Sequence, residues 1–331
     1  MSAFVDSVRG RFGVEPVCRE IETSASAYHA RRTRPPSRRA VRDEHLLSEI
    51  RRVHADSGGV YGQLKIWDEL RDEGVEVARC TVERLMRTNR IAGCLNGKVQ
   101  RTTLPGLSPV AADDLVRRDF SADRPDAVWL SDFTYIRTWE GWSYLSIVLD
   151  VHTRRIVGWQ LASHMRQSLV SDALDMAIAS RLEHEDGTIA HSDNGSQYTS
   201  YEYTERLKRA GIAPSRGRTG TALDNAMAES IMSTLKRELT KRFTWRTRLD
   251  LELALVTYIG WYNARRRHRS LKVVQDGRVR RLTPLQALDR YNQEVATKAW
   301  HPNERAYAEP GAFQYQIMAD AWDAARSQRG D

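Results

Sequence analysis

An aspartate within an apolar, strand-forming segment restricts the fold of this chain more than any other feature. Asp132 lies in WLSDFTYI, where aromatic and β-branched residues predict a β-strand. A carboxylate in a covered strand needs a partner, and the apolar neighbours disfavour the alternative of an edge strand facing water. Asp193 in HSDNGSQYTS and Glu229 in DNAMAESIMSTLKREL lie far along the chain. A fold that joins the three acids must bring distant elements to one place.

The segments around these acids alternate between strand and helix patterns. Three consecutive strands are expected within residues 127–163. A helix, a strand, a helix and a strand then follow to residue 217, and two long helices are expected over residues 222–239 and 249–267. This order of elements predicts a mixed α/β layer architecture.

Three helices are expected upstream, over residues 46–54, 61–73 and 81–90. Gly74 and Gly93 are expected to end the second and third helices, and Thr81 to cap the third. The third helix would bury Val82, Leu85 and Met86. In a helix-turn-helix unit the last helix enters the major groove. Its outward side chains are candidate DNA contacts, with a solvated face as the alternative: Arg79, Glu83, Arg84 and Arg87.

The first part of the chain combines short helices with a basic stretch. Residues 1–30 show helical patterns with a turn at Glu22, where Thr23 or Ser24 is the candidate N-cap. This segment is either a small DNA-binding unit or a helical pair that packs on its neighbour. Residues 31–42 contain six arginines and no acid, interrupted by two prolines. They are interpreted as a basic arm along a DNA backbone, with a solvated linker as the alternative.

The chain is basic, with a formal net charge of +8 and a sequence pI of about 9.5. Such a charge suits nucleic acid or an anionic membrane, and the preference for arginine over lysine suits bidentate phosphate contacts. No membrane span and no signal peptide are expected, so cytoplasmic location is the default. The odd number of cysteines (Cys18, Cys80 and Cys94) argues against a disulfide framework.

The three acids and their flanks resemble those of the DDE transposase and retroviral-integrase superfamily, with 35 residues between the last two acids. Further matching stretches are VYGQLKIWDELRDEGVEVARCTVERLMRTNRIAG, WYNARRRHRSL and LTPLQAL. Together they span residues 44–290 and are most similar to the second-frame product (OrfB) of the IS-three family of bacterial insertion sequences. Retroviral integrases also carry a zinc-binding His-His-Cys-Cys domain, but the 13 residues between Cys80 and Cys94 argue against zinc here.

The resemblance implies a ribonuclease H-like catalytic core, a mixed five-stranded sheet with flanking helices, preceded by all-helical helix-turn-helix DNA-binding units. Asp132 would then lie mid-strand on the central first strand, Asp193 at the end of the adjacent fourth strand, and Glu229 on a helix pointing toward both. These three residues are the expected catalytic residues and the ligands of two Mg²⁺ ions, for which Mn²⁺ can substitute. Such hard cations prefer oxygen ligands, and a pair of them can activate the attacking oxygen and stabilise the leaving one.

The helix that carries Glu229 holds further candidates. Lys236, on the same helical face, is the main expected DNA contact of the core, and Asn225, one turn before Glu229, is expected to orient it. Asp224 and Glu238 are competing acids, but the resemblance selects Glu229. Asp150, another acid, is expected to cap a turn after the second strand. Basic residues extend the expected DNA surface: Arg216, Arg218, Lys241, Arg242, Arg246, Arg248, Arg265, Arg266, Arg267, His268 and Arg269.

The expected domains are a small helical unit with a basic arm over 1–43, a helix-turn-helix domain over 44–100, a linker over 101–122, a catalytic domain over 123–290, and a tail over 291–331. The linker is expected to contain a short helix, DDLVRRDF, near its end. The tail, with the helical-looking segment QIMADAWDAARS, is expected to pack on a partner or remain mobile.

The resemblance implies a nucleoid-associated DNA transposase that frees a 3′-hydroxyl by metal-dependent cleavage and joins it to another DNA phosphate, without ATP. Its implied partners are double-stranded DNA at the element ends and the target, further copies of itself in a synaptic complex, and an upstream-frame protein fused by frameshifting. Two alternatives remain open. One is a non-catalytic DNA-binding regulator or domesticated derivative, and the other is a metal nuclease that does not join DNA.

Overall fold

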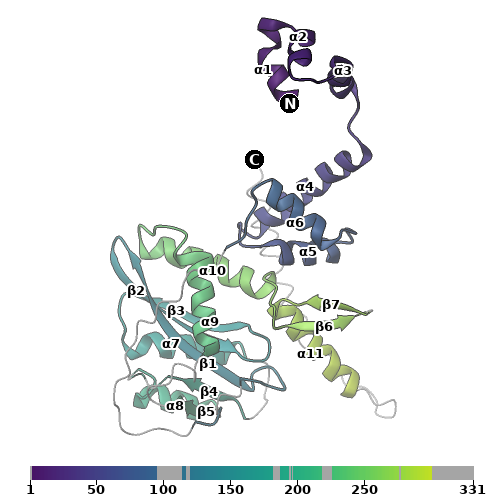
Figure 1. Cartoon of the computed structure of the whole chain (residues 1–331). Helices are drawn as coiled ribbons and strands as arrows, with labels where there is room; N and C mark the ends of the chain where they lie inside the picture. Colours follow the sequence, from purple (N-terminus) through teal and green to yellow (C-terminus); the bar gives the residue numbers. More distant parts are fainter. Residues whose placement is uncertain are drawn as a thin grey trace, which may run out of the picture.

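The computed structural model describes residues 2–94, 114–116, 120–181, 187–193, 195, 197–217, 226–275 and 277–299. Two helical units and one α/β unit follow each other along the chain, and the first helical unit extends away from the rest (Figure 1). No helix among these residues is long and apolar enough to cross a membrane.

The first helical unit consists of α1 (Ser2–Phe12), α2 (Val14–Glu20) and α3 (Ala25–Thr33). Its small core contains Val5, Val17, Cys18 and Tyr28. The Ser24 side chain accepts a hydrogen bond from the backbone N–H of Ala27, which confirms it as the N-cap of α3. The Tyr28 hydroxyl donates to Asp6 at 2.6 Å and ties α3 to α1.

A short extended link joins the first helical unit to α4 (Arg38–Asp56). The basic arm and the helix start that the sequence predicted need correction here, because α4 begins well before residue 46. Ser37 caps it by accepting from the N–H of Ala40 at 3.2 Å, and the prolines interrupt only the chain before this cap. The arginines of the predicted arm therefore lie at the end of α3, in the link and in the first turns of α4.

The second helical unit adds α5 (Gln63–Asp72) and α6 (Arg79–Thr88) to α4. Its core is formed by residues of all three helices, including Ile50, Ile66, Leu70, Val82, Leu85 and Met86. Gly74 has a positive φ of 82° and follows the end of α5, as predicted.

Two predicted signals of α6 are wrong. Ala78 occupies the N-cap position instead of Thr81, and Arg90, with φ of 56°, takes the left-handed conformation after the helix instead of Gly93. Gly93 has a different role, because a Cβ there would lie 2.5 Å from the backbone nitrogen of Gly62. The two chain segments can approach this closely only without a side chain at residue 93.

The α/β unit contains a five-stranded sheet in the order β3-β2-β1-β4-β5. β1 (Val128–Thr138), β2 (Gly141–Asp150) and β3 (Ile156–Ala162) form an antiparallel meander, and β4 (Ile189–Ser192) and β5 (Ala213–Arg216) run parallel to β1. All five strands lie where the sequence predicted them. Asp150 accepts from the N–H of Thr153 at 2.9 Å, which confirms its predicted role in the turn after β2.

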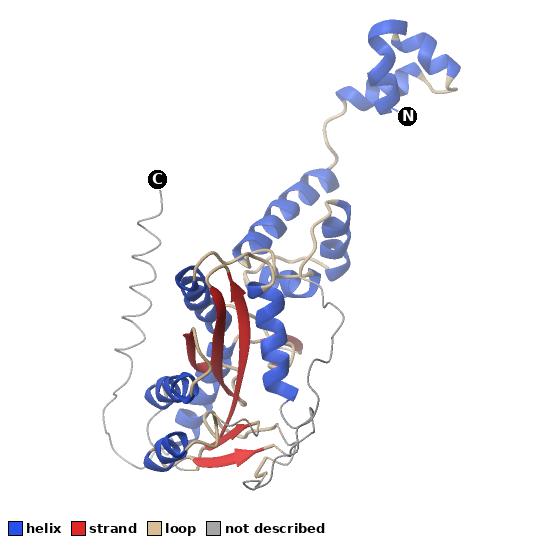
Figure 2. Ribbon diagram, turned by 90° about the vertical axis from the view of Figure 1, so that its left-hand side faces the viewer, coloured by secondary structure: helices blue, strands red, loops and turns tan. Residues whose placement is uncertain are grey.

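Helices cover both faces of this sheet (Figure 2). One core joins the sheet to α7 (Gln167–Ala179) and α8 (Tyr201–Arg209), through residues such as Trp129, Val148 and Leu174. The other joins it to α9 (Ala226–Leu235) and α10 (Arg248–Ala264), through residues such as Ile147, Met232 and Leu255. The sheet is therefore the middle layer of three, as the predicted order of elements requires.

Four elements at the C-terminal side were not predicted as such. After α9 the helix widens into the π-helical turn η2 (Lys236–Thr240). A hairpin of β6 (Lys272–Gln275) and β7 (Arg278–Arg281) follows α10, and α11 (Pro284–Ala299) crosses the predicted boundary at residue 290. The rest of the tail and most of the linker lie outside the described residues. Of the predicted DDLVRRDF helix, residues 114–116 and 120 are described, and they are not helical.

Candidate active site and nucleic-acid interface

Strand pairing brings Asp132 and Asp193 to the same level of the sheet. β1 and β4 are parallel neighbours, and Ser131 pairs with Ser192. Each aspartate follows its paired serine by one residue. Because neighbouring strands lie roughly 5 Å apart, the two carboxylates leave the sheet side by side.

Backbone N–H groups orient both carboxylates. Asp132 Oδ1 accepts from the N–H of Phe133 at 2.8 Å, and Asp193 Oδ1 accepts from the N–H of Gly195 at 3.1 Å. A Cβ on Gly195 would lie only 3.0 Å from that same Asp193 oxygen. A glycine at this position therefore lets the backbone approach the acid closely.

Glu229 lies in the first turn of α9, which packs against β1. Burial raises the pKa of Asp132 to about 7, and the negative charges of Asp193 and Glu229 add to this rise. Burial also raises the pKa of Asp193. The three predicted acids thus share one electrostatic environment, although they lie on three separate elements.

The donor chemistry of these acids fits a divalent cation. Burial raises the pKa of both aspartates, and a bound cation would favour their charged forms. Mg²⁺ prefers such oxygen donors. Within the described ranges, however, no three acidic, histidine or cysteine side chains lie close enough together to form a ready metal cluster.

Lys236 lies beside this acid cluster, at the start of η2. Burial lowers the pKa of Lys236, and the negative charge of Asp132 partly offsets this effect. Its Nζ also lies 5.7 Å from the centre of the Tyr135 ring. A cation is therefore present next to the carboxylates. Asn225 and Arg218, which were predicted to contribute nearby, lie outside the described residues.

The predicted DNA contacts Arg266, Arg267 and His268 need correction, because the structure buries all three side chains. The Arg266 guanidinium makes two hydrogen bonds to the carboxylate of Glu238, each 2.7 Å long, and Tyr258 donates to the same carboxylate. Burial lowers the pKa of His268 well below its usual value. Their polar groups face the protein interior, so the dense basic run in the sequence is largely internal.

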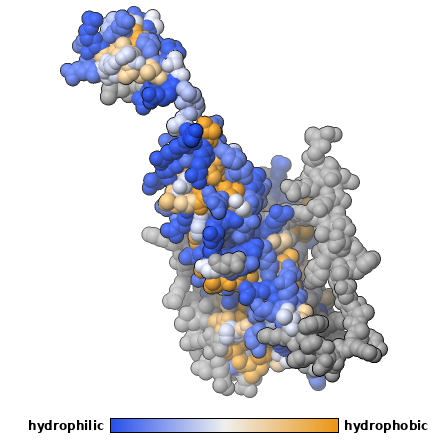
Figure 3. Space-filling view, turned by 90° about the vertical axis from the view of Figure 1, so that its right-hand side faces the viewer, coloured by the Kyte–Doolittle hydropathy of each residue, from blue (hydrophilic) through white to orange (hydrophobic). Residues whose placement is uncertain are grey.

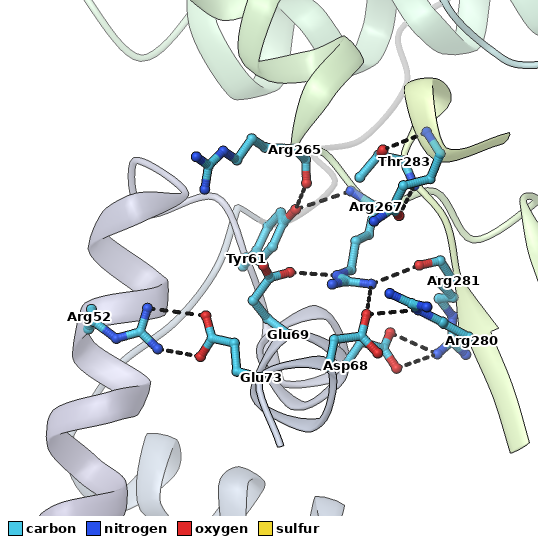
Figure 4. Close-up of polar contacts among 12 residues, drawn as sticks. Arg52, Tyr61, Asp68, Glu69, Glu73, Arg265, Arg267, Arg280, Arg281 and Thr283 are labelled. Atoms are coloured by element: carbon cyan, nitrogen blue, oxygen red, sulfur yellow. Dashed lines mark hydrogen bonds and ion pairs between the residues drawn. The ribbon is translucent and has the colours of Figure 1, made fainter. Parts of the chain in front are cut away.

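Arg267 connects the α/β unit to the second helical unit (Figure 4). Its guanidinium forms ion pairs with Glu69 at 2.5 Å and Asp72 at 2.6 Å, both on α5. Further contacts surround this pair: Arg281 with Asp68 at 2.9 Å, Arg280 with Asp72 at 3.2 Å, and the Tyr61 hydroxyl donating to the carbonyl of Arg265 at 2.7 Å. We call these residues the α5 clamp. Sequence reasoning missed it, and the acids clustered on α5 were its only signal.

The arginines of α6 differ in their surroundings. Arg79 and Arg87 are exposed, whereas Arg84 is half-buried and forms an ion pair with Asp43 of α4 at 2.7 Å. Hydrophilic side chains dominate the face of the helical units seen in Figure 3. Arg265 is exposed, and Arg216 donates to the carbonyl of Tyr198 at 3.4 Å.

Lys65 is a charged residue beside the α5 clamp, and it gives a pH-dependent prediction. Burial and the nearby Arg266 lower the pKa of Lys65 from 10.5 to about 7. The unfolded chain keeps this proton up to pH 10.5, so the fold is penalised most below pH 7 and the penalty fades as the pH rises toward 10.5. Lys65→Met is therefore expected to raise the midpoint of thermal unfolding at pH 6 and to lose this advantage at high pH.

Circular dichroism at several pH values would measure this effect. Lys208→Met, at an exposed position on α8, is the matched control and should change the midpoint little at any pH. A stabilisation by Lys65→Met that stays constant with pH would contradict the assigned cause.

Comparisons with known proteins agree with this architecture. Models of an integrase core domain match residues 122–222 and 210–274, and a model of an HTH-like domain matches residues 41–98. A Shigella sonnei protein named transposase for insertion sequence element IS629 is 45% identical over 80% of this chain and 90% of its own length. The putative transposase for insertion sequence element IS986/IS6110 of Mycobacterium tuberculosis is 45% identical over 73% of this chain and 88% of its own length.

A solved structure, the simian T-cell lymphotropic virus intasome in complex with a PP2A regulatory subunit, aligns over 79% of this chain and 78% of its own. Its sequence identity to this chain is 16% and the TM-score is 0.42.

Proposed function

Because the chain belongs to the insertion-sequence transposases with an integrase core domain, we propose that Asp132, Asp193 and Glu229 are its catalytic metal ligands. The proposed reaction is cleavage at the ends of an insertion sequence, followed by transfer of the freed 3′-hydroxyl to target DNA. The pairing of Ser131 with Ser192 supports it most directly, since this register sets the two aspartates side by side next to the helix of Glu229.

The proposed cofactor is a pair of Mg²⁺ ions, with Mn²⁺ as a substitute. When bound, such ions supply activation of the attacking oxygen and stabilisation of the leaving oxygen. The protein would contribute rigid placement, because Asp132 and Asp193 extend from paired strands and Glu229 from a packed helix. Lys236 would hold a phosphate of the bound strand next to these carboxylates.

We propose DNA contacts for the exposed or half-buried basic residues. On α6 these are Arg79 and Arg87, with Arg84 contributing if it leaves Asp43. In the α/β unit they are Lys236, Arg216 and Arg265. Asn225 and Arg218, which lie outside the described residues, are proposed from the sequence alone. Phosphate contacts of this kind would make binding weaken steeply as the salt concentration rises.

Further copies of the chain and an upstream-frame protein are the proposed partners. Joining two element ends to one target requires more than one catalytic core, which favours a homo-oligomer in a synaptic complex. The upstream-frame partner rests on the likeness to second-frame products. An enzyme of this kind would act on chromosomal DNA in the bacterial cytoplasm.

The test is cleavage and strand transfer on labelled DNA that carries the element's own ends, in the presence of Mg²⁺. Wild type should give joined products, and Glu229→Gln should give none, because the amide removes a charged metal ligand while keeping its shape. Glu252→Gln on α10 is the matched control and should keep activity. Cleavage by wild type without joining would favour a nuclease, and binding without any metal-dependent product would favour a regulator.

A further inference from the structure

Three aromatic side chains are exposed together at the hairpin between β1 and β2. Tyr135, Trp139 and Trp142 expose 56%, 68% and 50% of their surface. The rings of Tyr135 and Trp142 are in edge contact, with centroids 5.2 Å apart. Single exposed aromatics are common in soluble proteins, but a group on one hairpin marks an interaction surface.

A cation lies over each of these rings. Lys236 is 5.7 Å from the centre of Tyr135, Arg246 is 5.3 Å from that of Trp139, and Arg137 is 5.8 Å from that of Trp142. We call these six residues the aromatic platform. Its combination of flat apolar rings and positive charge matches a ligand that has both bases and phosphates.

The backbone beneath the platform is fixed, although the side chains are exposed. The N–H of Trp139 donates to the carbonyl of Trp245 at 3.0 Å, which ties the hairpin to the segment before α10. Glu140, the acid of this hairpin, accepts from the N–H of Arg248 at 2.8 Å at the start of α10. Figure 1 shows the hairpin beside that end of α10. The Glu140 carboxylate is therefore bound to the backbone of α10. The side chains of Arg137 and Arg246 are exposed and remain available to a ligand.

The platform is continuous with the proposed catalytic acids. Tyr135 follows Asp132 on the same strand. Lys236 lies over the Tyr135 ring, and the negative charge of Asp132 attracts its ammonium group. At a rise of about 3.3 Å per residue, the strand carries the platform roughly 20 Å from Asp132 to Trp139. A DNA strand held at the acids would reach the rings within a few nucleotides.

We propose that the aromatic platform binds unpaired nucleotides of the DNA strand next to the cleavage site. The bases of a duplex are stacked on one another, so exposed rings gain stacking partners only where the strand is unpaired. The rings would stack on these bases, and Arg137 and Arg246 would contact the phosphates between them. This inference rests on the proposed function for the location of the active site, but not for the binding itself.

The test compares binding to two DNA molecules in the absence of divalent metal, by fluorescence anisotropy. One is a fully paired duplex, and the other is the same duplex with a short unpaired 3′ tail. Trp139→Ala and Trp142→Ala should each weaken binding to the tailed DNA roughly 5- to 150-fold, the range for loss of one base stack, and leave the paired duplex almost unchanged. Trp139→Phe should retain most of the affinity.

Tyr201→Ala is the matched control, since Tyr201 on α8 is 82% exposed and should not affect either DNA. Equal losses on both DNA molecules, or no loss on the tailed one, would overturn the proposal. A smaller oligomer of Trp139→Ala in light scattering, with unchanged DNA binding, would also overturn it and assign the surface to contacts between chains.

Metal-dependent cleavage is measured separately on the wild type. If wild type fails to cleave but the tryptophan variants lose the preference for tailed DNA, the platform stands and the proposed catalysis fails. If wild type cleaves and the variants keep that preference, the platform fails alone.

Discussion

Asp132→Asn should abolish metal-dependent cleavage and strand transfer, with a loss of about 10³-fold or more. The substitution keeps the size of the side chain and its hydrogen bond from the N–H of Phe133, but removes the charge at the centre of the acid cluster. A metal site supplies several kcal/mol of transition-state stabilisation, and each factor of ten in rate corresponds to about 1.4 kcal/mol. Gel analysis of labelled DNA ends would measure both products.

Asp172→Asn, at a position on α7 with an exposed carboxylate, is the control and should keep activity. DNA binding by Asp132→Asn should be equal to or tighter than that of wild type, because a negative charge near the phosphates is lost. An Asp132→Asn protein that still cleaves DNA with Mg²⁺ would remove this residue from the proposed site.

Glu238→Gln should destabilise the protein by about 3–5 kcal/mol, the cost of leaving a buried charge without its partner. Glu238 and Arg266 are both almost fully buried and share two hydrogen bonds. Burial alone would raise the pKa of Glu238, but the hydrogen bonds and charge of Arg266 outweigh it and lower the pKa. Chemical denaturation at pH 7 would measure the change in the free energy of unfolding.

An exposed pair supplies the control for this second prediction. Glu202 and Arg206 on α8 approach to 2.9 Å, but both are partly exposed, so Glu202→Gln should cost no more than about 1 kcal/mol. Replacing both buried partners, Glu238→Leu with Arg266→Met, should recover most of the lost stability, since no charge is left buried. Equal costs for Glu238→Gln and Glu202→Gln would show that burial does not amplify this pair.

The amino-acid sequence was sufficient to predict β1 to β5 and α7 to α10, and it singled out Asp132, Asp193 and Glu229 as the candidate acids. Strand and helix periodicity is a local property, and each apolar pattern around Asp132, Asp193 and Glu229 was long enough to show it. Capping signals were less dependable. Ser24 and Gly74 act as predicted, but Thr81 does not, because helix ends shift by a few residues when a tertiary contact favours another start.

The sequence does not show which basic residues are buried and which are exposed. A run such as that from Arg265 to Arg269 has the same composition whether it faces DNA or the protein interior. Only the tertiary structure determines whether such arginines are buried or exposed. The partners of Arg267 are on α5 and the partner of Arg266 is on η2, and these elements are separate from the arginines in the sequence. Burying these charges is tolerated only where the fold supplies carboxylates to pair with them.

The proposed catalytic acids differ from the surfaces around them for the same reason. The types and flanks of the acids are local information, so the sequence by itself determined which residues to consider. The register of β1 on β4, the α5 clamp and the aromatic platform depend on contacts between distant segments. Tertiary structure alone decided them, since the energy of a charge or an exposed ring depends on what the fold places beside it.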